Sequence, residues 1–212
     1  MKYLLATTNK AKIKYFKPKL ETMGIDVITL NDLNIEACID EVGKSPVLNA
    51  VIKATTYNEL SNMPTIALDD GLYLEQVPDE LQPGTHVRRV SGKRLNDQEM
   101  IDYYISLVNK YGTNGKLKGY FLKGIAIVYN NETYTFEYRA NREFSNKWSS
   151  VINEGYSLAS IQIIEPFGKF KSELTKEEEK VTKDVEHKDV FEFILNTIKK
   201  LENKKILVKD CK

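Results

Sequence analysis

The first thirty residues alternate between apolar and amphipathic segments, and this pattern constrains the fold more than any other feature. Residues 2–7 are apolar enough for a buried strand, a polar turn follows at residues 8–9, and residues 25–30 form a second apolar run. Between the two runs, apolar residues recur at the spacing of one helix face, at Ile13, Phe16, Leu20 and Met23. Strand, turn, helix and strand make an α/β unit, so the chain is predicted to form a sheet flanked by helices. We expect Pro18 to kink or interrupt this helix and Gly24 to end it.

Bulk composition excludes several classes of protein. The 212 residues suit one large domain or a domain with a small lobe, and the net charge of +1 does not favour a general nucleic-acid binder. No apolar run is long enough to cross a membrane. Cys38 and Cys211 have neither metal-ligand spacing nor the pattern of a disulfide framework, so we expect a reducing compartment, the cytoplasm.

The stretch from Pro64 to Leu72 places two carboxylates, Asp69 and Asp70, after four small or β-favouring residues. It predicts a short strand that carries acidic side chains to its exposed end. Because strand side chains alternate between faces, only one of the two aspartates can face a given pocket. Such a carboxylate can hold a divalent cation or a water, although a surface Asp-Asp-Gly turn is the alternative interpretation.

The polar turn of residues 7–12 is the first candidate anion site. Backbone N–H groups at a helix N-terminus favour anions, and two threonines, an asparagine and two lysines here suit a phosphate. The alternative is that Thr8 or Asn9 simply caps the helix while the lysines are solvated.

A second helix is predicted to begin at Ser45, with Pro46 in its first turn. Asn49 and Lys53 lie four residues apart, so they share one face of this helix. An amide and an ammonium there could reach a phosphate or a carboxylate, or could be a solvated helix edge.

The rest of the chain supplies further elements. Asn96 and Glu99 predict a capping box for a helix that ends at Gly112. Residues 117–129 and 132–142 predict two strands joined in a hairpin at residues 130–131. A charged helix near residues 173–180, a final helix from His187 and a polar tail from about residue 203 complete the prediction.

In residues 6–92 the chain resembles the inosine/xanthosine triphosphate pyrophosphatases, the Ham1-like enzymes. Their Ala-Thr-x-Asn-x-x-Lys turn corresponds to residues 6–12, their Glu-x-Gly to 41–43 and their Asn-Ala-x-x-Lys-Ala to 49–54. Their Ile-Ala-Asp-Asp-Ser-Gly-Leu segment corresponds to 66–72, with Leu68 in the first aspartate position, Asp69 in the second and Asp70 in the serine position. Residues 83–92 resemble the family's Pro-Gly-x-x-x-x-Arg-x-x-Gly. The order and spacing of these pieces are together specific.

The second half departs from the family pattern. The family's Gly-Phe-Gly-Tyr-Asp-Pro segment corresponds to residues 155–160, Gly-Tyr-Ser-Leu-Ala-Ser, which lack the aspartate and the proline. The closing Ser-His-Arg of the family becomes Glu186-His187-Lys188, and lysine lacks the bidentate geometry of arginine.

The resemblance implies Mg²⁺-dependent hydrolysis of a nucleoside triphosphate to its monophosphate and pyrophosphate. On this basis Glu41 and Asp69 would bind the metal, and Asp69 would also activate the attacking water. The implied substrate-binding residues are Thr7, Thr8, Asn9, Lys12, Asn49, Lys53, Asp70, Lys180, His187 and Lys188.

The resemblance also implies one Ham1-like domain across residues 1–212. Its fold would be α/β, an elongated mixed sheet flanked by helices, with a cleft between two lobes, and the protein would be a homodimer. Three alternatives remain: the same chemistry on another modified nucleotide, nucleotide binding without turnover, and a structural domain with a coincidental motif.

Overall fold

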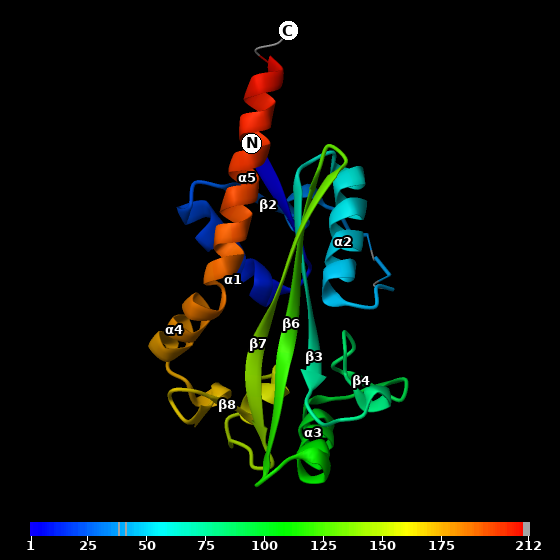
Figure 1. Ribbon diagram of the computed structural model, residues 1–212, viewed down its shortest axis with the longest axis vertical. Coiled ribbons are helices and arrows are strands. Elements are labelled where there is room, and N and C mark those ends of the chain that lie inside the picture. The colour runs from blue at the N-terminus through cyan, green and yellow to red at the C-terminus, as the bar shows by residue number, and fades with distance from the viewer. Residues whose placement is uncertain (38, 41, 210–212) are drawn as a thin grey trace. The chain divides into compact units, whose positions relative to one another are not determined.

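The computed structural model describes residues 1–37, 39–40 and 42–209, with side chains described through residue 203. Seven strands form a mixed α/β sheet in the order β2-β1-β3-β6-β7-β8-β9, and helices flank it (Figure 1), as predicted. The chain divides into two compact units. The first contains Met1–Asp69, Lys123–Tyr138 and the chain from His187 on, and the second contains Asp70–Leu122 and Arg139–Glu186.

The first unit begins with the predicted α/β element. Strand β1 (Lys2–Ala6) pairs in parallel with β2 (Asp26–Thr29) and with the first residues of β3 (Thr65–Leu74). Helix α1 (Lys10–Thr22) connects β1 to β2, and the turn η1 (Asn31–Leu33) follows. Helix α2 (Pro46–Ser61) precedes β3, and Ser45 caps it with Pro46 in its first turn, as predicted.

Helix α1 is continuous across Pro18, so Pro18 does not interrupt it, and the alternative expectation of a kink stays a prediction. Proline removes only one N–H group from the hydrogen-bond ladder. Phe16 and Leu20 on either side are buried in the core, and this packing holds the helix together. The chain leaves the helix at Gly24, whose positive φ of 81° suits a glycine after a helix end, as predicted.

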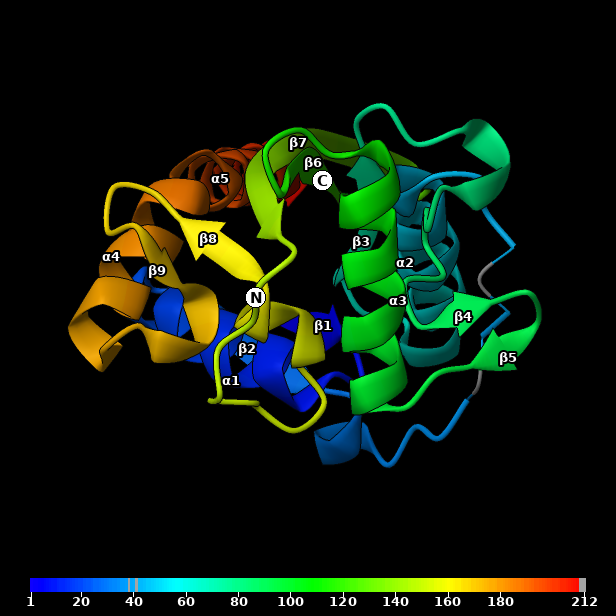
Figure 2. The ribbon, with the colours of Figure 1, turned by 90° about the horizontal axis from the view of Figure 1, so that it is seen from below.

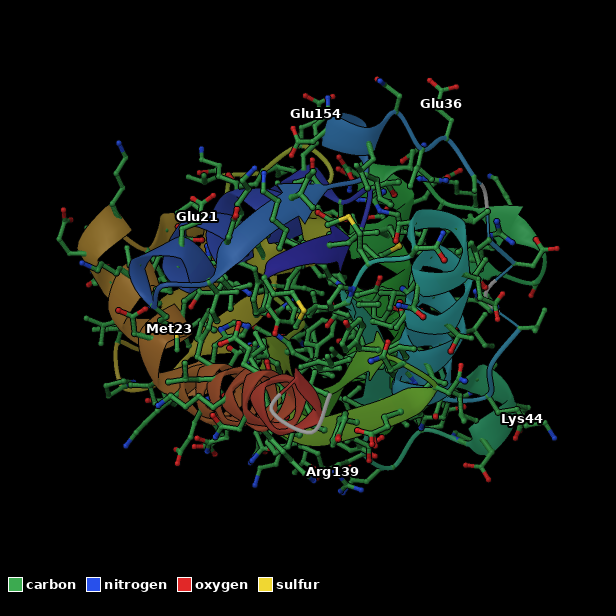
Figure 3. All side chains as sticks on the ribbon, turned by 90° about the horizontal axis from the view of Figure 1, so that it is seen from above. Glu21, Met23, Glu36, Lys44, Arg139 and Glu154 are labelled. Atoms are coloured by element: carbon green, nitrogen blue, oxygen red, sulfur yellow. The ribbon has the colours of Figure 1, made fainter. Side chains whose placement is uncertain are left out.

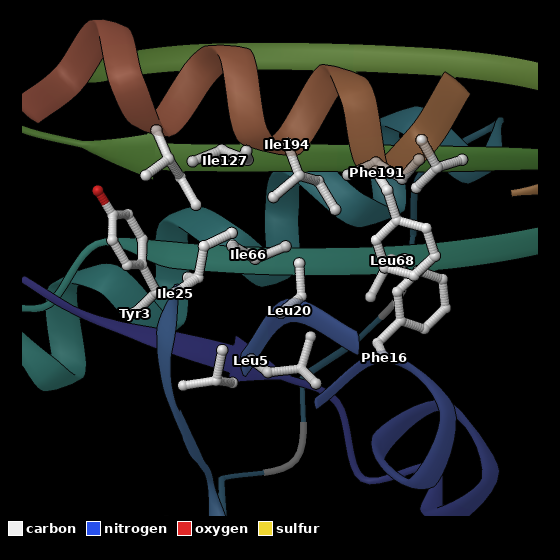
Figure 4. Packing of buried hydrophobic residues seen from close by; sticks show 14 of the residues in the cluster. Tyr3, Leu5, Phe16, Leu20, Ile25, Ile66, Leu68, Ile127, Phe191 and Ile194 are labelled. Atoms are coloured by element: carbon white, nitrogen blue, oxygen red, sulfur yellow. The ribbon is translucent and has the colours of Figure 1, made fainter. Parts of the chain in front are cut away.

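Alternating side chains divide the core of the first unit between the two faces of the sheet. Tyr3, Leu5, Ile66 and Leu68 pack against α1 and the last helix α5 (Lys188–Lys209), as Figure 4 shows. Leu4, Ala6 and Ala67 face α2 instead. Since successive strand residues point to opposite faces, Asp69 lies on the α2 face of β3.

The predicted hairpin is present and supplies strands to both units. Strand β6 (Lys116–Tyr129) turns at Asn130 and Asn131, both at positive φ, into β7 (Glu132–Ser145). Two consecutive residues with positive φ are the requirement of a tight hairpin turn, and asparagine tolerates that conformation.

The second unit packs a helix against the far part of these strands. Helix α3 (Asp97–Tyr111), with the predicted capping box of Asn96 and Glu99, shares a core with β3, β6, β7 and the turn η3 (Ser157–Ser160). Figure 2 shows α3 and β8 from below. Shorter elements complete the unit: η2 (Asp79–Leu81), β4 (Arg89–Val90), β5 (Lys93–Arg94), β8 (Gln162–Ile164), β9 (Lys169–Phe170), η4 (Lys171–Glu173) and α4 (Lys176–Glu186).

Helix α5 continues past residue 203, where the polar tail is predicted, to Lys209. Within the described residues, no helix has the length and apolar character needed to cross a membrane. The cleft predicted between two lobes stays a prediction.

Candidate functional site

The candidate site lies where β1 ends and β3 continues beyond it. Strand β1 stops at Ala6, which pairs with Ala67, so Leu68 and Asp69 extend past the last paired residue. The turn that leads into α1 begins at the same edge. In parallel α/β sheets, ligands bind at this carboxyl edge of the strands.

Asp69 is buried in the middle of β3, with 7% of its surface exposed. The expectation that β3 would deliver its carboxylates to an exposed end is therefore wrong. The strand continues to Leu74, whereas β1, its parallel neighbour, is only five residues long. The site arises because β1 stops early.

Two side chains of α2 hold the carboxylate of Asp69. Asn49 donates from Nδ2 to Oδ2 at 3.0 Å, and Lys53 donates from Nζ to Oδ1 at 2.6 Å. The predicted shared face of Asn49 and Lys53 is confirmed, and it faces Asp69. The ammonium and the carboxylate form an ion pair in which each side chain is about nine-tenths buried. A buried carboxylate is stable in this setting because a cation and an amide donor replace its water.

The turn before α1 supplies donors at the carboxyl end of β1. Asn9 caps the helix, and its Oδ1 accepts from the backbone N–H groups of Ala11 and Lys12. The Asn9 N–H donates to Thr7 Oγ1 at 3.2 Å. Lys12 Nζ donates to the carbonyl of Leu68 at 3.3 Å, so this ammonium lies one residue from Asp69 along β3. Asn9 therefore caps the helix, as the alternative interpretation held, but Lys12 is not simply solvated, because the turn places it beside the carboxylate.

These groups line one cavity of about 470 Å³ in the first unit. Its lining includes six of the residues that the sequence singled out, namely Thr7, Thr8, Asn9, Lys12, Lys53 and Asp69. It is formed by Ala6, Thr7, Thr8, Asn9, Lys12, Ile35, Glu36, Ala37, Ile39, Lys53, Tyr57, Leu68 and Asp69.

The sequence did not indicate the wall formed by Tyr57 together with Ile35, Glu36, Ala37 and Ile39. Residues 35–39 have no helical or strand periodicity, so no pattern indicated their position. Tyr57 belongs to the apolar stripe of α2, and its hydroxyl donates to the carbonyl of Ala37 at 2.8 Å. This bond fastens the wall to α2. Glu36 extends from the ribbon toward solvent (Figure 3).

Two predicted metal ligands have different outcomes. Asp69 lies in the cavity wall, whereas Glu41 falls outside the described residues. In the described part of the chain, no three side chains among His, Cys, Asp and Glu cluster in a way that would hold a metal ion by themselves.

The other predicted substrate-binding residues lie elsewhere. Asp70 is half-buried and points to the face of β3 opposite Asp69. Lys180 and Lys188 are exposed on α4 and at the start of α5. His187 is buried, and its ring centroid lies 4.9 Å from that of Tyr15, with its Nε2 3.3 Å from Lys123 Nζ. These four residues, like Asn49, are absent from the cavity lining, and their substrate contacts stay predictions.

Residues 155–160, which correspond to the divergent segment, are fastened to α3 in the second unit. The Gly155 N–H donates to Asp97 Oδ2 at 2.9 Å, and Arg88 donates to Asp97 Oδ1 at 2.5 Å. The hydrogen bond from Gly155, followed by that from Arg88, lowers the pKa of the Asp97 carboxyl below its usual value. Tyr156 is left exposed beside this anchor.

Comparison with known proteins places the chain in a family. A family model described as "Ham1 family" matches residues 3–183. A dITP/XTP pyrophosphatase of Leptospira interrogans is 30% identical over 173 residues, which cover 82% of this chain and 85% of the relative. A second protein of that name from Yersinia pseudotuberculosis is 26% identical over 183 residues, covering 84% of this chain and 88% of the relative.

Solved structures show the same fold. A HAM1 protein from Coxiella burnetii superimposes with a TM-score of 0.75 at 21% identity, covering 94% of this chain and 99% of that one. The Ham1 protein of Staphylococcus aureus gives a TM-score of 0.67 at 23% identity, covering 84% and 89%. With a family match over most of its length, the chain belongs to the Ham1 family.

Proposed function

We propose that this protein hydrolyses a nucleoside triphosphate to its monophosphate and pyrophosphate, with a non-canonical purine nucleotide as substrate. The observation that carries the proposal is the buried Asp69 carboxylate, held by Asn49 and Lys53 in the wall of a cavity that also contains Lys12. The names of the relatives, dITP/XTP pyrophosphatases, support the substrate class.

Phosphate binding falls to the turn after β1, to Lys12 in the first turn of α1 and to Lys53 in the middle of α2. The turn of residues 7–9 lies at the N-terminus of α1, where the helix dipole favours an anion. Lys12 and Lys53 add two positive charges to the same cavity. Fixed cations and dipoles stabilise the charge that develops on phosphate oxygens in the transition state.

Asp69 is the group suited to accept a proton from the attacking water. The water oxygen forms a bond to phosphorus, the bridging P–O bond between the α and β phosphates breaks, and pyrophosphate leaves with the bond electrons. The proton passes to Asp69 and then to solvent. A carboxylate held at both oxygens keeps one orientation toward the water, which general-base catalysis requires.

The residues present also fit Mg²⁺, which usually takes one or two carboxylates together with phosphate oxygens and waters. Asp69 supplies a buried carboxylate, and Glu41 is its predicted companion. Glu36 is a further carboxylate of the lining. Such a donor set suits a cation that binds together with the nucleotide. When bound, Mg²⁺ would neutralise charge on the phosphate oxygens.

A second candidate function is the same hydrolysis on a different modified nucleotide. Residues 155–160 lack the aspartate and proline of the family segment, which favours a changed base preference. Lys180, His187 and Lys188 remain the predicted contacts to the nucleotide from the C-terminal side. We also propose that the protein works in the cytoplasm as a homodimer.

The test is pyrophosphate release in the presence of Mg²⁺ across inosine, xanthosine and standard nucleoside triphosphates. Release concentrated on inosine and xanthosine nucleotides supports the first candidate, and release concentrated on another nucleotide supports the second. Binding of nucleotides without release would mean that the protein binds but does not turn over its ligand.

Asp69→Asn should abolish release while leaving the fold intact, because asparagine keeps the shape but cannot accept the proton. Asp102→Asn is the matched control, since Asp102 is an exposed carboxylate on α3 that accepts a hydrogen bond from Gln98. Circular dichroism should give the same spectrum for both variants. Full activity in Asp69→Asn would overturn the assignment.

A further inference from the structure

Asn49 has no exposed surface, although it belongs to the helix face that lines the site. Both ends of its side-chain amide are engaged inside the protein. Nδ2 donates to Asp69 Oδ2 at 3.0 Å, and Oδ1 accepts from the Gly43 N–H at 2.8 Å. A side chain without exposed surface cannot contact a nucleotide in the cavity, so any contribution of Asn49 to the reaction must pass through Asp69.

The Gly43 N–H determines which way the amide of Asn49 faces. If the amide were turned over, its NH₂ group would meet the N–H of Gly43, and its oxygen would meet the carboxylate of Asp69. Two donors would then face each other, as would two acceptors. The backbone of Gly43 therefore directs the donor end of Asn49 toward Asp69.

The approach of Gly43 to Asn49 requires a residue without a side chain. A Cβ atom at position 43 would lie 2.5 Å from Asn49 Oδ1 and 2.9 Å from the backbone nitrogen of Asn49. Both distances are shorter than a carbon can tolerate without displacing its neighbour. Glycine at this position thus makes the short N–H contact possible.

We propose that Asn49 is a positioning residue for Asp69, and that Gly43 sets its orientation. This inference rests on the proposed function. Lys53 fixes Oδ1 of the carboxylate with a charged donor, and Asn49 fixes Oδ2 with a neutral one. Two donors on different oxygens set the plane of the carboxylate, so its remaining lone pairs keep one direction.

The experiment compares Asn49→Ala with Asn58→Ala in the pyrophosphate assay. Asn58 is a suitable control because it is another asparagine of α2, part-buried, whose amide donates to the carbonyl of Met63, away from Asp69. We expect kcat to fall about 10–100-fold in Asn49→Ala, the usual effect of removing a group that orients a ligand or catalytic side chain, with KM changed less than about threefold. Asn58→Ala should lose stability but keep its kcat.

Gly43→Ala provides a second test that leaves Asn49 in place. The added methyl group should displace the Asn49 amide and lower kcat in the same way. In the double variant the two losses should overlap instead of multiplying, because both act on one hydrogen-bond chain.

A kcat near that of the parent in both single variants would overturn the inference, as would a change confined to KM. Losses that multiply in the double variant would also overturn it. The result for the parent protein separates the two proposals. No pyrophosphate release by the parent would remove the proposed function and this inference with it, whereas an active parent with unaffected variants would remove the inference alone.

Discussion

At the scale of single residues, the ion pair of Lys53 and Asp69 is the strongest electrostatic feature of the site. Each side chain is about nine-tenths buried, and the Nζ–Oδ1 distance is 2.6 Å. Removing one partner of a buried pair leaves a charge without water and without a counter-charge, which costs more than removing both.

Lys53→Met should therefore lower the free energy of unfolding by about 3 kcal/mol, measured by urea denaturation at neutral pH. Adding Asp69→Asn should restore much of this loss, because neither charge then remains. A double variant as unstable as Lys53→Met would show that packing of the lysine chain, and not charge, stabilises the pair.

At the scale of elements, helix ends and the hairpin follow directly from the sequence. Ser45 with Pro46, Asn96 with Glu99, and the asparagine pair at residues 130–131 act through neighbouring atoms, so local patterns predicted them. The length of β1 relative to β3 could not be predicted in this way. Register between distant strands depends on packing across the sheet, and this register is what places Asp69 beyond the end of β1.

The cavity was only partly predictable for the same reason. Lys12 and Lys53 of the lining, and Asn49, which donates to Asp69, were found because a turn and a helix face have recognisable spacing. Tyr57 belongs to the apolar stripe of α2, and nothing in the sequence distinguishes a stripe residue that also lines a cavity. Residues 35–39 have no periodic signal at all.

The first turn of α3 yields a prediction about pH. The pKa of Asp97 in the folded protein is lowered by the Gly155 N–H and by Arg88. The ionised Asp97 carboxylate therefore contributes its full stabilisation above the unfolded pKa of about 4. This stabilisation is lost as the pH falls through the lower folded pKa. In thermal scans between pH 7 and pH 2.5, Asp97→Asn should lower Tm most at neutral pH and approach the parent protein at the acidic end. An equal difference in Tm at every pH would contradict this origin. Asp102→Asn, on the same helix, should follow the parent throughout.

At the scale of the whole molecule, the two ends of the described chain meet in one core. Tyr3 and Leu5 of β1 belong to the same cluster as Val190, Ile194 and Ile198 of α5. The core of the first unit is thus completed only when α5 packs onto β1. The residues that meet in this core are separated by most of the length of the chain. Contacts between segments so far apart in sequence slow folding, because a long loop must close before they form.

Ile194→Ala should therefore destabilise the whole first unit and not only its final helix. Ile194 has no exposed surface, and removing a buried isoleucine side chain beyond its β-carbon costs about 2–5 kcal/mol. Glu192→Ala, two residues away on the exposed side of α5, should change the free energy of unfolding by less than about 0.5 kcal/mol. Hydrogen exchange should show faster opening of β1 and β3 in Ile194→Ala. Exchange accelerated in α5 alone would mean that this helix unfolds independently.

The position of Asp69 within a paired strand also limits how the length of this sequence can vary in evolution. If the pairing of β3 with β1 is kept, a one-residue insertion between residues 65 and 69 would move Leu68 into the position that faces Asn49 and Lys53. A one-residue deletion there would move Asp70 into that position. Either change also exchanges the two faces of the strand for every residue on one side of it. Insertions and deletions should accordingly accumulate in the connections between elements, and β3 should keep a constant length between its pairing with β1 and Asp69.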